Sequence, residues 1–238
     1  MFAKKISTIG DVDIIVLPEM FTTGFTNNTT TLAESMEGET HLWLKQIAKK
    51  KSAVVCGSII AKEDNKYYNR FLWVQPDGTT FHYDKKHLFA MAGEDEHYSA
   101  GTKKQIVEYK GWKINLQVCY DLRFPVWSRR KEDQENDYDL MLYVASWPVA
   151  RVHAWSTLLK ARAIENMSYV VGVNRVGTDG KGFEYSGASS IISCLGAELQ
   201  SAESGKEEII SHKLDYKHLT KVREKLPFHK DQDQFKLL

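Results

Sequence analysis

Short runs of consecutive apolar residues are the feature that most restricts how this chain can fold. Residues 13–17 (DIIVL) and 53–60 (AVVCGSII) are rich in β-branched side chains and lack the polar alternation of a strand with one wet face. Runs of this kind are typical of strands that are covered on both faces. We therefore predict a buried strand at each of them.

Helical patterns alternate with these runs. Apolar spacing predicts helices over 40–51, 124–131 and 152–167, and a short helix near the C-terminus. Further strands are predicted at 67–75, 80–83, 112–118, 140–145, 169–174, 187–193 and 207–212, with turns at 64–65 and 76–78. A layered α/β protein with two sheets and outer helices accommodates this order of elements.

The length and composition fit one large core. The chain has 238 residues, 42% of them hydrophobic, and its 5 prolines are spread out. We find no Ser/Gly-rich linker, and the most polar run, 131–139, is expected to be a surface loop between two elements. We predict a single domain that spans residues 1–238.

Charge and cysteine content exclude several classes of partner. Lys plus Arg number 32 and Asp plus Glu 31, so the net charge is +1, and nucleic acid or an anionic membrane is not expected as a partner. No apolar run approaches the roughly 18 residues that span a bilayer, and residues 1–10 lack the apolar stretch of a signal peptide. The 3 cysteines are far apart without C-x-x-C spacing. Free thiols in a reducing cytoplasm are the expectation.

Cys119 is the first candidate for chemistry. It stands where the predicted strand 112–118 stops and a helical segment follows, so we expect a sharp turn that exposes the thiol to a substrate. A helix N-terminus beside it would favour the thiolate. A buried structural cysteine is the competing interpretation, because free cysteine is among the most buried residue types.

Glu19 and Lys85 are the other candidates. Glu19 lies just past the strand 13–17, among Leu, Pro, Met and Phe, where a partly desolvated carboxylate would suit a general base. Lys85 is one of two adjacent lysines, and it could point inward while Lys86 stays in solvent. Taken alone, a solvated loop glutamate and a surface lysine pair explain these positions better.

Three segments together resemble a known family. Leu-Pro-Glu-Met-Phe at 17–21, Lys-Lys-His-Leu-Phe at 85–89 and Val-Cys-Tyr-Asp-Leu-Arg-Phe-Pro at 118–125 are similar to the signature segments of the nitrilase superfamily, the carbon–nitrogen hydrolases. They occur in the family's order and with similar spacing. The resemblance continues at 145–148, 161–166, 174–175 and 187–189, and so covers about residues 10–215.

The resemblance implies a fold and a set of roles. The fold would be a four-layer α-β-β-α sandwich that pairs through its helices into a homodimer. Glu19 would be the general base, Lys85 the charge stabiliser and Cys119 the nucleophile, with the backbone N–H of Tyr120 as a second donor to the oxyanion. The family's second glutamate matches Glu94 rather than Glu96. Neither a metal nor another cofactor is implied.

One departure concerns the start of the chain. Members of the family usually begin with a further strand and most of a helix before the segment that residues 2–6 resemble. We therefore expect the sandwich to lack its first strand, and the strand 13–17 to lack a neighbour. A sheet with such a gap is expected to be poorly stable, or to fill the gap with another chain.

The segments 119–127 and 146–166 most resemble the ω-amidase branch, which hydrolyses the terminal amide of α-keto dicarboxylic monoamides such as 2-oxoglutaramate or 2-oxosuccinamate. Such a substrate ends in a carboxylate, for which Arg123, Arg151 and Arg175 are unranked candidate ligands. Trp147 and Phe25 are candidate pocket walls. An N-carbamoyl-amino-acid hydrolase is the alternative within the fold. A catalytically silent binding protein is the alternative from another class, and the intact Glu, Lys and Cys argue against it.

Overall fold

The computed structural model describes residues 1–131, 137–233 and 235. Its strands are β1 (Ile14–Val16), β2 (Val54–Glu63), β3 (Lys66–Val74), β4 (Thr80–Asp84), β5 (Ile106–Tyr109), β6 (Trp112–Val118), β7 (Leu140–Ala145), β8 (Tyr169–Asn174), β9 (Val176–Thr178), β10 (Glu184–Ser186), β11 (Ser190–Ile192) and β12 (Glu198–Ser201). Its α-helices are α1 (Phe2–Ser7), α2 (Thr29–Leu32), α3 (Glu39–Lys51), α4 (Glu94–His97), α5 (Pro125–Ser128), α6 (Val152–Asn166) and α7 (Tyr216–Lys225). Short 3-10 turns occupy Ala90–Ala92, Cys119–Arg123, Val149–Arg151 and Phe228–Asp231.

The strands form two main sheets. The first has the order β1-β2-β3-β4, with β1 parallel to β2 and the other neighbours antiparallel. The second has the order β12-β11-β8-β7-β6-β5, in which β6, β7 and β8 run parallel. A small hairpin of β9 and β10 lies apart from both. The turn between β2 and β3 confirms the prediction at 64–65, where Asp64 and Asn65 have φ of 47° and 59°.

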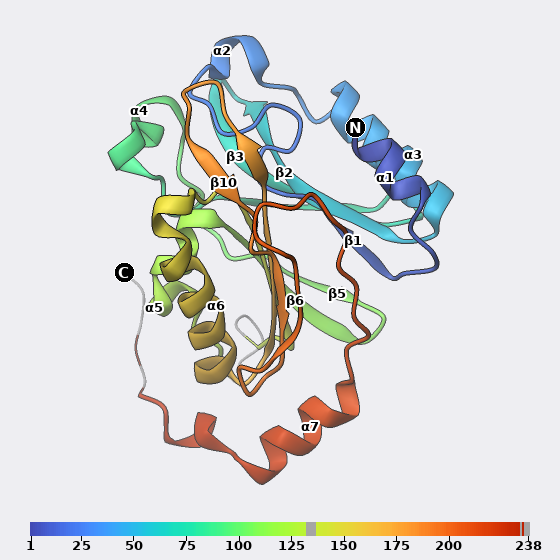
Figure 1. The fold of residues 1–238 in the computed structure, drawn as a ribbon, viewed down its shortest axis with the longest axis vertical. Helices are drawn as coiled ribbons and strands as arrows, with labels where there is room; N and C mark the ends of the chain where they lie inside the picture. The colour runs from blue at the N-terminus through green and yellow to red at the C-terminus, as the bar shows by residue number, and fades with distance from the viewer. Residues whose placement is uncertain (132–136, 234, 236–238) are drawn as a thin grey trace.

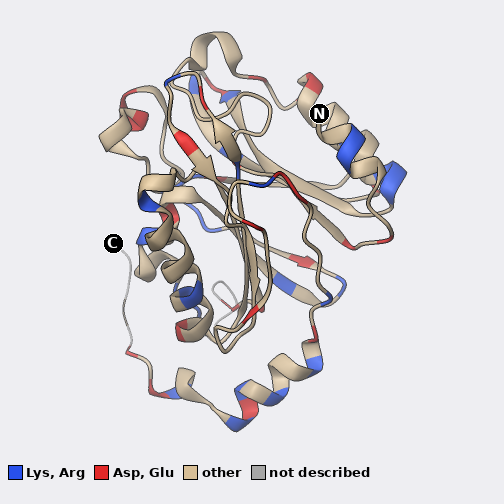
Figure 2. Cartoon of the chain, viewed as in Figure 1, with Lys and Arg blue, Asp and Glu red and all other residues tan. Residues whose placement is uncertain are grey.

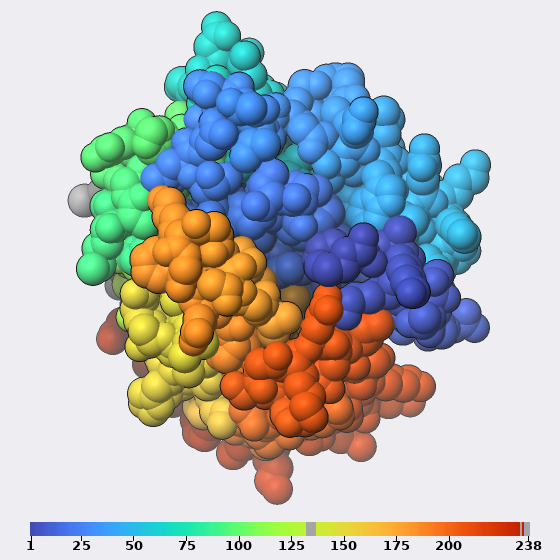
Figure 3. Space-filling model, turned by 45° about the horizontal axis from the view of Figure 1, so that its top comes forward, coloured from blue at the N-terminus to red at the C-terminus, as the bar shows by residue number. Residues whose placement is uncertain are grey.

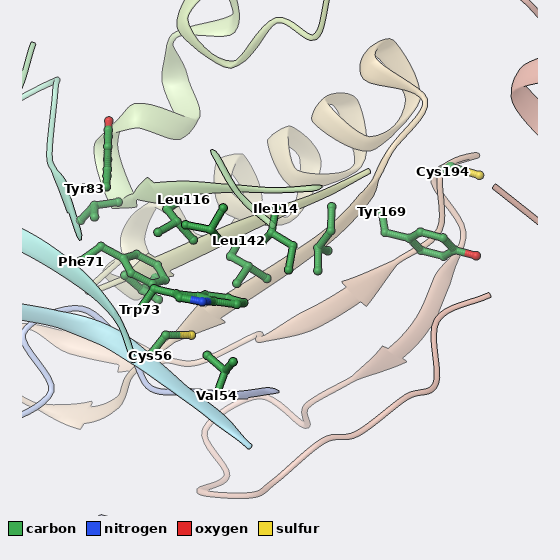
Figure 4. Packing of buried hydrophobic residues seen from close by; sticks show 14 of the residues in the cluster. Val54, Cys56, Phe71, Trp73, Tyr83, Ile114, Leu116, Leu142, Tyr169 and Cys194 are labelled. Carbon is green, nitrogen blue, oxygen red and sulfur yellow. The ribbon is translucent and has the colours of Figure 1, made fainter. Parts of the chain in front are cut away.

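Alternation along the central strands builds a core between the two sheets. In β3, Phe71 and Trp73 face this core, whereas Leu72 faces outward into a second cluster. In the opposite sheet, Leu116 of β6 and Leu142 of β7 face the same core. Figure 4 shows these side chains meeting between the sheets. A strand has a side-chain period of two, so a sheet whose strands are apolar throughout must be covered on both faces.

Helices supply the two outer covers. Leu44 and Ala48 of α3, with Ile6 of α1, pack on the outer face of the first sheet. Trp155 and Leu159 of α6 pack on the outer face of the second. Figure 1 shows α1 and α3 on one side of the molecule and α5 and α6 on the other. The predicted four-layer α-β-β-α sandwich is confirmed.

Several predicted elements differ in the structure. The helix expected over 124–131 is a single turn, α5, and it follows a 3-10 turn that begins at Cys119. The strand expected at 187–193 shortens to β11. The strand expected at 207–212 was wrong, because this segment runs alongside the molecule without joining either sheet. The loop expected at 131–139 lies mostly outside the described residues.

Strand β1 forms one edge of its sheet, although its apolar sequence predicted burial on both faces. Ile14 and Val16 are only half-buried, and Ile15 alone is fully buried. A cleft of about 1140 Å³ adjoins β1 and is lined on its far side by residues 205–214. Figure 3 shows the surface hollowed where the blue N-terminal residues meet the orange-red segment. Among the described residues, β1 pairs with β2 alone.

Helix α7 attaches to the second sheet through a half-buried arginine. Arg223 donates hydrogen bonds to Asp139 Oδ1 at 2.8 Å, to the Met167 carbonyl at 2.9 Å and to the Tyr138 carbonyl at 2.7 Å. The remaining charges of α7 are of both signs and face outward (Figure 2). Across the part of the chain that the structure describes, no helix combines the length and apolarity needed to cross a bilayer.

Candidate active site

The candidate residues meet at one end of the sandwich. Glu19 comes three residues after β1, Lys85 directly after β4, and Cys119 directly after β6. Two successive antiparallel pairings make β4 parallel to β2 and therefore to β1. The carboxyl ends of these strands lie at the same edge of their sheet, where α/β proteins commonly place their sites. Residues 100 positions apart in sequence thus converge.

Glu19 is buried, with 1% of its surface exposed, and each of its oxygens has a donor. Its Oε2 accepts from the backbone N–H of Ser146 at 2.7 Å. Its Oε1 accepts from Lys85 Nζ at 3.1 Å and from Asn69 Nδ2 at 2.7 Å. The next residue, Met20, has φ of 43° and donates its N–H to Ser58 Oγ, which fixes the backbone where the carboxylate leaves it.

Lys85 lies between two buried carboxylates. Its Nζ donates to Glu94 Oε1 and Oε2 at 2.9 and 2.8 Å, as well as to Glu19. Burial alone would lower the pKa of Lys85, but the charges of Glu19 and Glu94 overcome it and raise that pKa well above its ordinary value. The ammonium is therefore a permanent positive charge at neutral pH. Glu96 is exposed and takes no part in this cluster.

Asn69 is a member of the cluster that the sequence analysis missed. Its Nδ2 donates to Glu19 Oε1 at 2.7 Å and to Glu94 Oε1 at 3.2 Å, and its carbonyl accepts from the Lys85 N–H at 3.0 Å. It is fully buried in the middle of β3. The available signal was an amide, next to Arg70, in the interior of the predicted strand 67–75.

Cys119 occupies the predicted sharp turn. Its φ of 44° is a left-handed conformation, which costs a non-glycine residue about 1–2 kcal/mol. Burial and the charge of Glu19 raise the pKa of the Cys119 thiol well above its ordinary value, while Lys85 and the Ser146 N–H oppose them. The expectation that a helix N-terminus would favour the thiolate was therefore wrong for the free protein, because a 3-10 turn is a weak dipole beside two carboxylates.

The other predicted site residues surround this cluster at different depths. The ring of Phe25 lies 5.8 Å from Lys85 Nζ, and the half-buried ring of Tyr120 packs against Phe89 and Phe124. Trp147 follows Ser146 and is 3% exposed, with its ring tilted against Trp155. Trp147 is thus mainly a core residue, and its ring lies under the Arg123 guanidinium. Tyr120 is the second residue of its turn, where backbone N–H groups lack partners within the helix.

The three candidate arginines differ in what they contact. Arg151 is exposed and lies over the Phe89 ring at 5.3 Å. Arg175 lies over the Tyr185 ring at 4.5 Å and donates to the Thr178 carbonyl at 3.5 Å.

Arg123 stands apart from them. It is half-buried and stacked 4.8 Å over Trp147, and within the described residues its guanidinium has no hydrogen bond or ion pair. An aromatic ring on one face orients a guanidinium without using its N–H donors. Arg123 therefore keeps its donors available to a ligand, four residues after Cys119.

The cluster contains the parts of a covalent hydrolase. A thiol adjoins a buried carboxylate that can take its proton, and a fixed ammonium adjoins both. A second carboxylate, Glu94, holds that ammonium from its other side. Within residues 1–131, 137–233 and 235, no group of three or more His, Cys, Asp or Glu side chains is arranged to hold a metal ion.

Comparisons with known proteins identify a family and several relatives. The family described as carbon–nitrogen hydrolase matches residues 2–224. An "Omega-amidase YafV" of Yersinia enterocolitica is 48% identical over 100% of this chain and 91% of its own length. A "2-oxoglutaramate amidase" of Bacillus subtilis is 35% identical over 92% of this chain and 84% of its own length.

A solved structure is similar over the whole of this chain. A Xanthomonas campestris protein of the CN-hydrolase superfamily, crystallised with an arsenic adduct in its active site, superposes with a TM-score of 0.96 at 41% identity. The alignment covers 100% of this chain and 91% of that one. At this identity and coverage the similarity extends beyond the fold to the sequence.

Proposed function

Since this chain belongs to the carbon–nitrogen hydrolase family, we propose that it is an amidase acting on the terminal amide of a small α-keto dicarboxylic monoamide such as 2-oxoglutaramate. The observation that carries this proposal is the buried cluster of Lys85 with Glu19 and Glu94 beside the Cys119 thiol. A cation fixed between two carboxylates and a thiol still protonated at rest suit general-base attack on a neutral amide.

In the first half of the reaction, Glu19 accepts the thiol proton as the Cys119 sulfur attacks the amide carbonyl carbon. The Lys85 ammonium and the Tyr120 N–H hold the oxyanion that develops, each worth about 3–4 kcal/mol in the transition state. Glu19 then returns the proton to the leaving nitrogen. Ammonia departs, and the acyl group remains on Cys119 as a thioester.

In the second half, a water molecule hydrolyses the thioester after ammonia has left. Glu19 takes a proton from the water, whose oxygen attacks the thioester carbonyl, and the thiolate of Cys119 leaves and recovers that proton. Glu94 keeps Lys85 in place through both halves, because its two oxygens accept 2.9 and 2.8 Å bonds from Nζ. The products are a carboxylic acid and ammonia.

Arg123 is the residue that we propose for the substrate's free carboxylate. It shares the turn of Cys119, it is half-buried, and its guanidinium donors are unused among the described residues. A charge-assisted hydrogen bond to a carboxylate is worth about 1.5–3 kcal/mol. An amide substrate without a free carboxylate would lack the contribution of that hydrogen bond to binding.

A panel of substrates tests the function. We expect ammonia release to be fastest from 2-oxoglutaramate, slower from butyramide, and slowest from an N-carbamoyl amino acid and a nitrile. Arg123→Met should raise KM for 2-oxoglutaramate about tenfold or more and leave butyramide unaffected. The matched control is Arg151→Met, which should leave KM unchanged for both 2-oxoglutaramate and butyramide. Faster turnover of the N-carbamoyl amino acid would overturn the ω-amidase assignment, and no turnover of any compound would favour the silent binding protein.

We also infer a homodimer in a reducing compartment such as the cytoplasm. Val126 of α5 and Ile164 of α6 are about half exposed on the helix layer outside the second sheet, and Leu195 is exposed as well. Apolar side chains on an outer helix layer favour pairing of that layer with a second copy. The three cysteines are free. Sedimentation of the purified protein at micromolar concentration would establish the size of the assembly.

A further inference from the structure

Asp121 is a buried carboxylate near the nucleophile that does not contact the Lys85 cluster. It is fully buried and accepts four hydrogen bonds, two at each oxygen. Oδ2 accepts from the Tyr83 hydroxyl at 2.8 Å and from the Val118 N–H at 3.1 Å. Oδ1 accepts from the His87 N–H at 3.0 Å and from His87 Nδ1 at 2.8 Å. Its acceptor capacity is therefore used entirely within the protein.

The donors to Asp121 come from two separate segments. Val118 immediately precedes Cys119, whereas Tyr83 and His87 lie two residues before and two residues after Lys85. One carboxylate thus ties the turn that carries the thiol to the loop that carries the ammonium. This connection bridges 34 positions of sequence and joins strands of different sheets, β6 and β4.

The bond to Val118 also spans the strained residue. Val118 and Asp121 lie on either side of Cys119, whose φ is 44°. A left-handed non-glycine residue persists only where its surroundings over-determine the backbone. The carboxylate of Asp121 provides such a restraint, because it holds the N–H that precedes Cys119 from a side chain that follows it.

Further contacts make the link rigid. The His87 ring stacks on Phe124 with centroids 3.8 Å apart, and the Trp127 Nε1–H donates to the Tyr83 hydroxyl at 3.0 Å. Both aromatic residues follow the nucleophile's turn, in and next to α5. The turn and the loop are therefore held together by packing around the central carboxylate.

We propose that Asp121 is a positioning residue of the amidase, which sets the distance between the Cys119 sulfur and the Lys85 ammonium. This inference rests on the proposed function. Asp121 touches neither substrate nor the reacting atoms, and it acts through the two segments that it joins. A displacement of about 1 Å at a reacting centre lowers the rate by up to about a hundredfold. Loss of Asp121 should therefore lower kcat while the substrate still binds.

Asp121→Asn is the direct test, because asparagine has the same shape as aspartate. Its NH2 group would replace one acceptor oxygen and would face N–H or O–H donors, so those hydrogen bonds would be lost. We expect kcat to fall about a hundredfold with KM changed by less than about threefold. The matched control is Asp139→Asn. Asp139 is also buried, and it accepts from the Lys113 N–H and from Arg223 at the opposite end of β7. The Asp139→Asn variant should lose about as much thermal stability as Asp121→Asn and keep the kcat of the original protein.

Two milder variants decide the matter if Asp121→Asn does not fold. Tyr83→Phe and His87→Phe each remove one donor, and the second keeps a ring against Phe124. Each should lower kcat severalfold without a matching change in KM. The proposal is overturned if the folded variants keep full kcat, or if the Asp121 and Asp139 variants lose activity only in proportion to their unfolded fractions.

A second readout separates this proposal from the amidase assignment. The rate at which iodoacetamide alkylates Cys119 requires no substrate, and mass spectrometry of the labelled peptide measures it. We expect Asp121→Asn to change this rate severalfold and Asp139→Asn to leave it unaltered. If the unmodified protein hydrolysed no amide, the alkylation rates would still test the positioning role, and equal rates in all three proteins would reject it.

Discussion

Two groups of buried or half-buried charges lie at opposite ends of β6 and β7. At the carboxyl ends, the Lys85 ammonium is shared by the carboxylates of Glu19 and Glu94. At the amino ends, Arg223 pairs with Asp139, while Lys113 and Arg130 both pair with Asp137. In the first group one lysine is shared by two carboxylates, whereas in the second, among the described residues, each carboxylate pairs with at least one basic side chain.

The partners of these charged groups decide what each end can do. At the carboxyl ends, burial and the charge of Glu19 raise the pKa of the Cys119 thiol, so a proton is present to be transferred and a carboxylate is present to take it. At the amino ends, Arg130 and Lys113 outweigh the effect of burial and lower the pKa of Asp137. Those groups stay ionised and hold elements together. Similar burial therefore serves proton transfer at one end and attachment of α7 at the other.

The largest effect that this contrast predicts belongs to the nucleophile. Cys119→Ala should reduce turnover below about a thousandth, because no sulfur remains to attack the amide, and it should lower stability by no more than about 1 kcal/mol, because the half-buried side chain loses a single atom from its packing. Cys56→Ala and Cys194→Ala are the matched controls. Both thiols are buried away from the cluster, so their loss should lower stability by about 1 kcal/mol and keep kcat. Residual activity above that level would rule out the thioester route.

The next effect concerns the shared cation. Lys85→Met should lower kcat about a hundredfold or more, because it removes the positive charge proposed to hold the oxyanion. It should also destabilise the fold, since Glu19 and Glu94 would remain buried without their cation. Lys86→Met is the control.

Lys86 sits in the same loop with its ammonium 5.5 Å over the Trp127 ring, and its loss should be close to neutral for kcat. The measurement is kcat at a temperature where circular dichroism shows each variant folded. An equal loss of kcat in Lys85→Met and Lys86→Met would mean that the two lysines share one role. It would contradict the prediction that only the buried cation acts in catalysis.

The sequence predicted one part of this site well and another part poorly. The strands β6 and β7 were predicted to the residue, because β7 is apolar on both faces and β6 alternates apolar with polar residues at the period of a strand. Cys119 could then be placed at the end of β6, and Lys85 past β4. The resemblance of the three segments, rather than periodicity, singled out Lys85 over Lys86.

What the sequence did not reveal depends on contacts between distant segments. Asn69 lies 50 positions from Glu19, and only the register of β3 brings its amide to that carboxylate. The Ser146 N–H is a backbone donor, which any residue could supply. The segment 207–212 has a strand-like sequence, but a strand also needs a neighbour that offers hydrogen bonds, and sequence alone does not specify one.

The smallest predicted effect tests the other half of the comparison, at the amino ends of β6 and β7. Asp137 accepts from Arg130 at 2.7 Å and from Lys113 at 3.0 Å, and its pKa is lower in the folded protein than the ordinary value of 3.8. A carboxyl group with a depressed folded pKa stabilises the fold above its unfolded pKa. That contribution is lost as the pH falls through the folded pKa.

Asp137→Asn removes this contribution at every pH. The difference in free energy of unfolding between the original protein and the variant should be constant above about pH 5 and shrink as the pH falls below about 4. Urea titrations at pH 7, 5, 4 and 3 measure this difference, and kcat at pH 7 should be the same in both proteins.

Asp77→Asn is the control, because this exposed turn residue has a depressed pKa through its bonds to Thr79 rather than through an ion pair. Added salt at pH 7 should reduce the difference in free energy of unfolding between the original protein and Asp137→Asn more than the difference for Asp77→Asn. Equal reductions for the two variants would show that Asp137 does not act through ion pairs. A difference for Asp137 that did not change with pH would show that its charge does not hold this end together, and the contrast would then rest on the catalytic end alone.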